Sequence, residues 1–328
     1  MIVFATSIAE CGEKEYLERF MKYCKKNGKD VKLFEQSKIM IDIAKKTNPN
    51  INKYTILKLP ETTLNALRAA AYERILSNLD RKAVNIISAH TSFWVKSGPE
   101  PAIDISYLMR LNPDIFIQFV DLEYDIYTAM KKNKELDEKE KLSLKEIALW
   151  QEIETYTNRL LAREHNKPFY LIGARYHPES MLYDLIFNPW KPKIYQSFPI
   201  THLDEKNKMK VLNFIKKLRK YAIVFDPIEV KHPKINDNEI TELIDRYTVK
   251  RDMRLIDQSD FVVVYFPKLV YSSGVEYEIN YAAKLGKQVW IIKPDVHAGP
   301  FTEYNADRIF NDPNECLEEI KKYSELTK

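Results

Sequence analysis

The order of apolar runs along this chain of 328 residues restricts its fold more than any other feature. Short runs rich in Val, Ile, Phe and Tyr alternate with longer segments in which apolar residues recur at helical spacing. This alternation predicts α/β architecture with parallel sheets, because a parallel crossover needs a helix between its two strands. The expected strands are 1–6, 30–35, 83–90, 114–121 and 168–174 in the first half, and 193–198, 221–227, 261–266 and 288–294 in the second.

Length and one proline-containing stretch predict two domains. A chain of this length exceeds one average domain. Between the two groups of strands lies FNPWKPK (residues 187–193), which has two prolines and no helical period. We therefore expect domains at 1–188 and 193–328, each a doubly wound parallel sheet.

Composition narrows the class of protein. No run of 18 apolar residues occurs, and MIVFATSIAE lacks the basic region of a signal peptide, so neither a membrane span nor a leader is expected. The 51 basic and 47 acidic residues are interspersed, which gives little support for nucleic-acid binding. Three cysteines without a CxxC pair argue against a disulfide framework or a cysteine-built metal site, and they fit a reducing cytoplasm. Richness in Lys, Glu and Ile leans toward a heat-adapted source.

Two charged segments are interpreted as surface features. Residues 131–145 mix lysines with acids, which predicts a solvated helix or a lid rather than a nucleic-acid site. Residues 213–221 place apolar side chains at helical spacing beneath a basic face. That pattern favours a packed helix over a docking patch.

The turn after the first strand is where a phosphate-binding loop would lie. Such a loop has the pattern GxxxxGK[ST], in which backbone N–H groups and the lysine hold the phosphates. In TSIAECGEKEYL, Gly12 matches the second glycine, but Ser7 replaces the first and Glu13 replaces the lysine. Lys14 takes the hydroxyl position. A glutamate there would repel a triphosphate, so no phosphoryl transfer is expected.

Residues 1–180 resemble an archaeal-type adenylate kinase, a family with the P-loop kinase fold. The resemblance is carried by NIISAH (85–90), by 94–119 and by 148–162. It implies a degenerate member, because Ser88 replaces the acid that would support Mg²⁺ and the lid has lysines and glutamates where arginines would stabilise the phosphoryl group. His90 and Arg74 are expected to be structural, and no metal or other cofactor is expected.

Polar residues gather at strand ends in the second half. Tyr195 closes one strand and Ser197 begins its loop, while a helix carrying Asp252 leads into the strand 261–266. Ligands of doubly wound sheets bind beyond the carboxyl ends of the strands. Each residue also has a structural interpretation: Asp252, for example, could pair with Arg251 or Arg254.

The stretch SSGVEYE follows the same strand. Ser272, Ser273 and Gly274 offer hydroxyl and N–H groups at a helix N-terminus, a natural anion site. They could equally be an ordinary helix cap, and Glu276 and Glu278 could be ordinary acids in a first turn.

Taken together, residues 193–310 resemble the nucleoside 2-deoxyribosyltransferase family, and most closely its 2′-deoxynucleoside 5′-monophosphate N-glycosidases. The pattern is a tyrosine on the first strand, an aspartate eight residues before that of SDFVVV, and a Ser-x-Gly-Val-x-Tyr-Glu block. The resemblance implies a flavodoxin-like Rossmann domain and the following roles: Glu278 as nucleophile, Asp252 serving the leaving base, Tyr195 orienting the nucleophile, Ser272 contacting phosphate, and Ser197, Ser273 and Gly274 binding substrate. It also implies a homodimer or larger oligomer, with 297–304 near the neighbouring subunit's site.

The resemblance implies cleavage or exchange of the N-glycosidic bond of a nucleoside or nucleotide, through a glycosyl-enzyme. A carboxylate can stabilise and trap the oxocarbenium-like centre at C1′, and a raised-pKa aspartate can protonate the departing base. The monophosphate branch has a glycine-rich loop where this chain has SFPITH. Whether the substrate carries a phosphate is therefore left open. Hydrolysis and transfer also remain open, as does a non-enzymatic nucleotide-binding or scaffolding role. The third hypothesis for the function is an active nucleotide kinase.

Glu276 and Glu278 are expected to lie on different sides of one helix. Side chains two residues apart in a helix point in directions that differ by about 200° around its axis. Glu278 shares a face with Ala282, toward the sheet, so Glu276 should turn toward water or a subunit contact.

Overall fold

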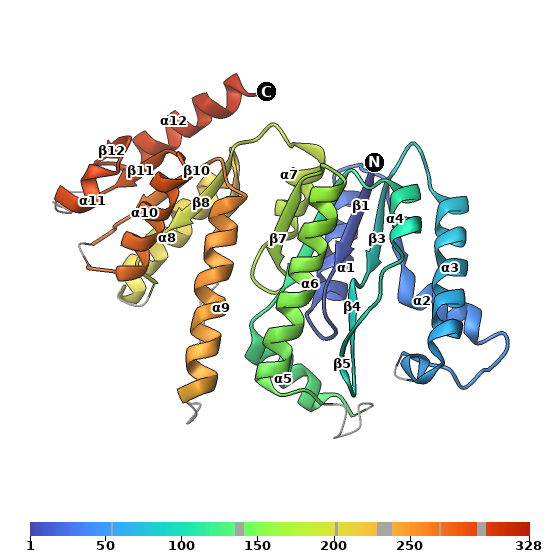
Figure 1. The fold of residues 1–328 in the computed structure, drawn as a ribbon. Helices are drawn as coiled ribbons and strands as arrows, with labels where there is room; N and C mark the ends of the chain where they lie inside the picture. The colour runs from blue at the N-terminus through green and yellow to red at the C-terminus, as the bar shows by residue number, and fades with distance from the viewer. Residues whose placement is uncertain (54, 135–140, 201–202, 228–237, 269, 294–299) are drawn as a thin grey trace. The chain divides into compact units, whose positions relative to one another are not determined.

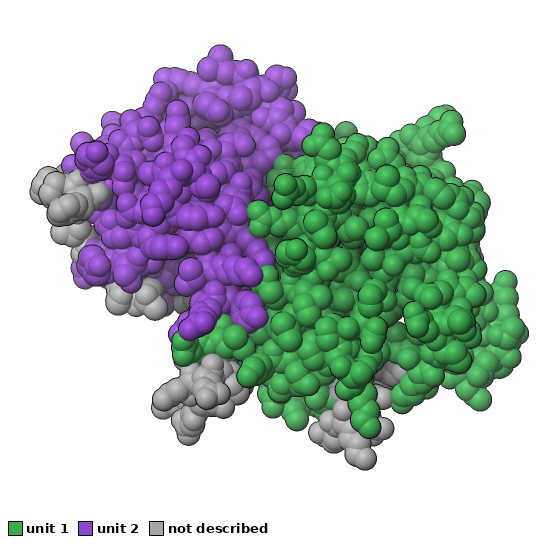
Figure 2. Space-filling view, viewed as in Figure 1, with its two compact units in different colours: residues 1–176, 233–244 green, residues 177–232, 245–328 purple. Residues whose placement is uncertain are grey.

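The computed structural model describes residues 1–53, 55–134, 141–200, 203–227, 238–268, 270–293 and 300–328. The chain forms two compact units (Figure 2), one of residues 1–176 with 233–244 and one of residues 177–232 with 245–328. The first division falls after residue 176. Helix α7 (Glu179–Phe187) therefore belongs to the second unit, where it packs on strand β9 (Ile223–Phe225). No helix in the described residues is long and apolar enough to cross a membrane.

The first unit is built on a five-stranded parallel sheet in the order β2-β3-β1-β6-β7 (Figure 1). Its strands are β1 (Ile2–Thr6), β2 (Val31–Glu35), β3 (Val84–Ala89), β6 (Ile115–Val120) and β7 (Phe169–Gly173). Its helices are α1 (Glu13–Lys26), α2 (Gln36–Ala44), α3 (Glu61–Asn78), α4 (Ile105–Leu111), α5 (Glu123–Lys132) and α6 (Leu144–Glu164), with a 3₁₀ turn at Ile56–Lys58.

Alternation along the strands divides the apolar residues of this sheet between its two faces. Phe4, Ile87 and Phe116 pack with residues of α3, α4 and α6 on one face. On the other face Tyr16 of α1 packs against Phe119 of β6, with ring centroids 4.9 Å apart. Helices on both faces of a parallel sheet are the doubly wound arrangement.

The second unit contains a second five-stranded parallel sheet, in the order β12-β11-β10-β8-β9. Its strands are β8 (Lys193–Ser197), β9, β10 (Phe261–Tyr265), β11 (Val289–Ile292) and β12 (Arg308–Phe310). Its other helices are α8 (Glu205–Leu218), α10 (Ser273–Lys284), α11 (Pro300–Tyr304) and α12 (Pro313–Leu326), and α9 (Asn238–Asp257) leads into β10.

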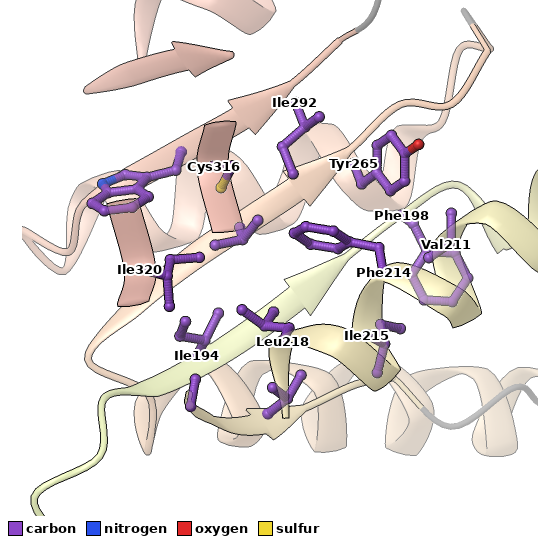
Figure 3. Packing of buried hydrophobic residues seen from close by; sticks show 14 of the residues in the cluster. Ile194, Phe198, Val211, Phe214, Ile215, Leu218, Tyr265, Ile292, Cys316 and Ile320 are labelled. Atoms are coloured by element: carbon purple, nitrogen blue, oxygen red, sulfur yellow. The ribbon is translucent and has the colours of Figure 1, made fainter. Parts of the chain in front are cut away.

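One face of this sheet carries the apolar core of the second unit (Figure 3). Ile194, Tyr265 and Ile292 from the strands pack with residues of α8 and α12, among them Phe214 and Ile320. Within α8 the apolar positions Val211, Phe214, Ile215 and Leu218 are buried, while Lys216 and Lys217 are exposed. The expectation of a packed helix is therefore confirmed for residues 213–218, while residues 219–221 form a turn.

The predicted fold class is confirmed, and all nine expected strands are present. The sequence analysis missed two features. The antiparallel hairpin of β4 (Ser92–Val95) and β5 (Gly98–Pro101) turns at residues 96–97. Strand β5 begins at Gly98, which has φ +119°, and contains two prolines, so its sequence is not typical of strands. Strand β12 has only three residues at the edge of its sheet, too few for a periodic signal.

Candidate functional site

The candidate site lies where the strand order of the second sheet reverses. From β8 the chain proceeds to β9 on one side, and then crosses back to β10 on the other side of β8. Connections that leave adjacent strands for opposite faces open a ligand-binding position beyond their carboxyl ends. Tyr195 and Ser197 of β8 are in register with Val262 and Val264 of β10 at this position.

Period-two alternation directs Tyr195 and Ser197 toward α10. Ile194 faces the core shared with α8 and α12. Because side chains alternate along a strand, Tyr195 and Ser197 face the opposite side of the sheet. On that side α10 packs against β10 and β11. It presents Glu278, which is buried together with Val275, Ile279 and Ala282. The expected sheet-facing orientation of Glu278 is what the structure has.

Two hydroxyl groups hold the Glu278 carboxyl group. The Tyr195 hydroxyl donates to Oε1 at 2.8 Å, and the Ser197 hydroxyl donates to Oε2 at 2.5 Å. Tyr195 and Ser197 are fully buried, and Glu278 is 8% exposed. Each carboxyl oxygen thus has its own donor from one strand, which fixes the plane of the group.

Burial governs the ionisation of the site. Burial, reinforced by the negative charge of Asp252, raises the pKa of Glu278 to about 8, although the Ser197 and Tyr195 hydroxyls act to lower it. Burial also raises the pKa of Asp252 to about 6, with the charge of Arg251 opposing the rise. The pKa of Tyr195 is well above its usual value, through burial and then through the charges of Glu278 and Asp252. The two carboxyl groups and the phenol are therefore electrostatically coupled.

No ion pair among the described residues involves Asp252. Its Oδ1 is buried and has no hydrogen-bond partner in the described structure. The alternative that Asp252 pairs with Arg251 or Arg254 is not what the described residues show, since no ion pair joins them. A buried, unpaired carboxyl oxygen that influences Glu278 is a group available for chemistry.

Ser272, Ser273 and Gly274 form the start of α10. Ser272 is its N-cap, and its hydroxyl accepts from the Val275 N–H at 3.4 Å. Ser273 and Gly274 are exposed, and a side chain added at Gly274 would meet only the Ser272 hydroxyl, at 3.8 Å. Capping accounts for Ser272 in this structure, and the substrate-binding roles of all three remain predictions.

Glu276 does not reach the Tyr195 and Ser197 hydroxyls. It is half-buried and accepts a hydrogen bond from Thr302 of α11. A second hydrogen bond to α10 comes from Asn305, the residue after α11, whose amide donates to Asn280 Oδ1 at 2.9 Å. Glu276 thus helps to attach α11 to α10 within its own unit, a contact that sequence reasoning missed because it depends on a partner 26 residues away. Of the expected subunit segment 297–304, residues 297–299 lie outside the described part of the chain.

In the first unit, the side chain of Glu13 lies at the loop after β1. Glu13, the first residue of α1, is buried and accepts a hydrogen bond from the Ser7 hydroxyl. Burial raises its pKa to about 7, against the effect of the Ser7 and Ser88 hydroxyls. Lys14 is exposed to solvent. The carboxyl group therefore lies at the helix N-terminus, where an anion would otherwise be attracted.

Gly12 is required by the geometry of this loop. It has φ +86° at the N-cap of α1, a conformation that favours glycine. A Cβ there would also come within 3.3 Å of the Arg175 side chain, which pairs with Asp121 and donates to the Glu10 carbonyl at 3.1 Å.

His90 and Arg74 occupy different settings. The His90 Nδ1–H group donates to the Ser7 carbonyl at 2.6 Å, and burial lowers the pKa of His90. This bond links the ends of β1 and β3, which agrees with the structural role expected for His90. Arg74 lies exposed on α3.

Three polar residues of the second unit, Arg251, His177 and Asp226, were given no functional role from the sequence. Arg251 precedes Asp252 on α9 and is 5% exposed. His177 donates from Nε2 to the Asp226 carbonyl, 3.1 Å away, at the end of β9. The sequence does show an arginine directly before Asp252, but by itself this pattern predicts only an ion pair between the two.

Comparisons with known proteins give weak likenesses only. No protein-family model matches the chain, and no curated protein matches it. Among solved structures, it is similar to a conserved protein from Enterococcus faecalis V583, at 18% identity and a TM-score of 0.29, over 40% of this chain and 98% of that one. It is also similar to a 2-deoxyribosyltransferase from Bacillus psychrosaccharolyticus, at 20% identity and a TM-score of 0.32, over 38% of this chain and 89% of that one. Likenesses at this level carry no weight for function, which has to be inferred from the geometry of the site.

Proposed function

We propose that the second unit cleaves or exchanges the N-glycosidic bond of a nucleoside or nucleotide, with Glu278 as nucleophile. The observation that carries this proposal is the buried Glu278 carboxyl group, held by the Tyr195 and Ser197 hydroxyls at the reversal of strand order. A carboxylate oriented through both oxygens has little freedom to lose when it meets an electrophilic carbon. Burial in addition strengthens its interaction with positive charge that develops on a sugar.

In the proposed reaction, one Glu278 oxygen attacks C1′ of the sugar. The C1′–N bond breaks, and its electron pair leaves with the base nitrogen, which takes a proton from Asp252. The product is a glycosyl ester on Glu278 and a neutral base. Water or a second base then attacks C1′, which releases the Glu278 carboxylate and returns a proton to Asp252.

The resting protonation pattern must change before attack. At neutral pH the higher pKa of Glu278 keeps its carboxyl group protonated and leaves Asp252 ionised. The reactive form has the opposite arrangement. A sugar that develops positive charge beside Glu278 favours its anion, so substrate itself drives the proton toward Asp252.

The direct test measures free base released from a panel of nucleosides and nucleotides by the native protein and by Glu278→Gln. We expect a loss of about 10³-fold or more, since the variant keeps the shape but removes the attacking oxyanion. Glu276→Gln is the matched control, because it alters a glutamate of the same helix that bonds to Thr302; its loss should be about tenfold or less.

Two results would reject the proposal. One is base release that survives Glu278→Gln and disappears with Glu276→Gln. The other is a complete absence of base release from every substrate, which would favour a non-enzymatic nucleotide-binding or scaffolding protein. The Glu13 carboxyl group inside the first-unit loop is the observation that favours this second candidate.

A further inference from the structure

Arg251 is a buried cation with hydrogen-bond donors that lack partners in the described structure. Its side chain is 5% exposed, and Nε and Nη2 are buried without a hydrogen-bond partner in the described structure. A guanidinium remains charged in proteins, and leaving it buried and unpaired costs several kcal/mol. The two free groups lie on one edge of the guanidinium, the edge that bonds a carbonyl or similar acceptor.

The position of Arg251 connects it to the site around Glu278. It directly precedes Asp252 on α9, and its charge lowers the pKa of both Asp252 and His177. His177 is bonded to the backbone of Asp226, whose charge in turn contributes to the raised pKa of Tyr195. Asp252 Oδ1 is likewise buried without a hydrogen-bond partner in the described structure, so Arg251, Asp252, His177 and Asp226 form one electrostatically coupled group in which two consecutive residues of α9 leave polar atoms unsatisfied.

What this group lacks is a hydrogen-bond acceptor rather than negative charge. Arg219 pairs with Asp226 at 2.5 Å, so these two charges cancel. Arg251 and the ionised Asp252 also cancel in sum, although they make no ion pair. A neutral oxygen with free lone pairs would satisfy Arg251 without adding net charge to a buried site.

We propose that Arg251 is a specificity-determining residue that donates Nε–H and Nη2–H to a carbonyl oxygen of the leaving base. This inference rests on the proposed function and narrows its substrates to bases with a keto group, 6-oxopurines and 4-oxopyrimidines. A guanidinium has donors and no acceptor. An amino group in the same place would set donor against donor, so the amino-bearing counterparts are rejected.

The test uses substrate pairs that differ only in this group: 2′-deoxyinosine against 2′-deoxyadenosine, and 2′-deoxyuridine against 2′-deoxycytidine. The native protein should release the keto base with a kcat/KM at least about 10²-fold higher in one pair, because a site built to bond an oxygen rejects its analogue strongly. In Arg251→Met, kcat/KM for that keto substrate should fall about 10²-fold, and for the amino substrate less than about tenfold. Arg254→Met, a half-buried arginine on the same helix, is the control and should keep the native ratio.

A binding measurement separates this inference from the proposed function. Calorimetry on Glu278→Gln, with and without Arg251→Met, should show tighter binding of 2′-deoxyinosine than of 2′-deoxyadenosine, or of 2′-deoxyuridine than of 2′-deoxycytidine, only while Arg251 is present. If no substrate is cleaved but this dependence remains, the proposed reaction fails and the role of Arg251 stands. Thermal unfolding should show Arg251→Met folded, with a melting temperature no lower than native, since methionine removes an unpaired buried charge at similar length.

Several outcomes would overturn the inference. Equal losses on keto and amino substrates would mean that Arg251 acts only on the charge of Asp252. A native preference for amino bases, or activity indifferent to the exchange of keto for amino, would remove its basis. A loss confined to 5′-monophosphates, whatever their base, would assign Arg251 to the phosphate instead.

Discussion

At the residue scale, Ser197 helps to hold the Glu278 carboxyl group in place. Its hydroxyl donates to Glu278 Oε2, while Tyr195 donates to Oε1. Hydrogen bonds to a charged group contribute about 1.5–3 kcal/mol, enough to decide the orientation and part of the acidity of a carboxylate. We therefore propose a positioning role for Ser197 in the reaction, and the substrate contact predicted from the sequence remains a prediction.

Replacing Ser197 with alanine should lower kcat by about 10- to 100-fold and change KM little, because the lost bond acts on Glu278. The loss should be larger below neutral pH. Without this donor the pKa of Glu278 rises further, so less of the anion is present. Steady-state kinetics across pH check both effects, with Ser143→Ala, which removes the cap of α6 in the first unit, as the control. A raised KM with kcat intact would return Ser197 to substrate binding.

The two carboxyl groups predict the pH dependence of the reaction. Glu278 must be ionised and Asp252 protonated, and their pKa values are about 8 and about 6. Activity should therefore be bell-shaped in kcat/KM, with limbs near pH 6 and pH 8 that belong to the pair rather than to either residue. In Asp252→Asn one limb should disappear, and a substrate whose base leaves without protonation should suffer least. A profile that stays flat from pH 5 to pH 9 would contradict the assignment.

At the scale of elements, the reversal of strand order between β8 and β10 creates the site. The N-terminus of α10 follows β10, and the first turns of this helix supply both the cap at Ser272 and the carboxyl group at Glu278. A matching geometry exists in the first unit, where α1 follows β1 and Glu13 begins the helix. The two helices differ in the partners of these carboxyl groups. Glu13 of α1 accepts a hydrogen bond from the loop after β1, whereas Glu278 of α10 accepts hydrogen bonds from two hydroxyl groups of strand β8.

The loop after β1 should not support phosphoryl transfer. The buried Glu13 carboxyl group bonds to Ser7 where phosphate would be attracted, and Lys14 is turned to solvent. ADP formation from ATP and AMP is therefore expected to be absent at a sensitivity well below the roughly 1–100 s⁻¹ typical of kinases. The native protein is the sample, and an active adenylate kinase is the assay control. Turnover within that range would show that another group binds the phosphates.

At the scale of the whole molecule, each unit has its own parallel sheet and its own core. Phe4, Tyr72 and Phe116 belong to the core of the first, and Ile194, Phe214 and Ile320 to that of the second. All the residues of the proposed reaction lie within the second unit, which gives the first unit no direct part in the chemistry proposed here.

Self-association remains a prediction, drawn from the family resemblance of residues 193–310. Sedimentation velocity at micromolar concentration should show a dimer or a larger species. Tyr271, Tyr277 and Tyr304 are exposed on and around α10 and α11, at 78%, 54% and 87%. Replacing Tyr304 with serine should weaken the association if this surface is the contact. A protein that sediments only as monomer would contradict the prediction.

Much of this architecture could be predicted from the sequence for a simple physical reason. Buried parallel strands read as continuous apolar runs, such as FVVVYF, and helices between them show a period of 3.6. Both signals are local. Elements without a local signal escaped: β12 has three residues at a sheet edge, and the β4–β5 hairpin contains prolines.

The helix period also determined that Glu278 faces the sheet with Ala282 and that Glu276 does not share its position. What only the tertiary structure decided is which groups meet across long separations in the chain. Ser197 reaches Glu278 over 81 residues, and Glu276 reaches Thr302 over 26. Strand pairing and helix packing bring these atoms within hydrogen-bond distance, and no pattern in either segment encodes the other. The same holds for Arg251, whose residue type is visible in the sequence but whose unsatisfied nitrogens exist only in the folded unit.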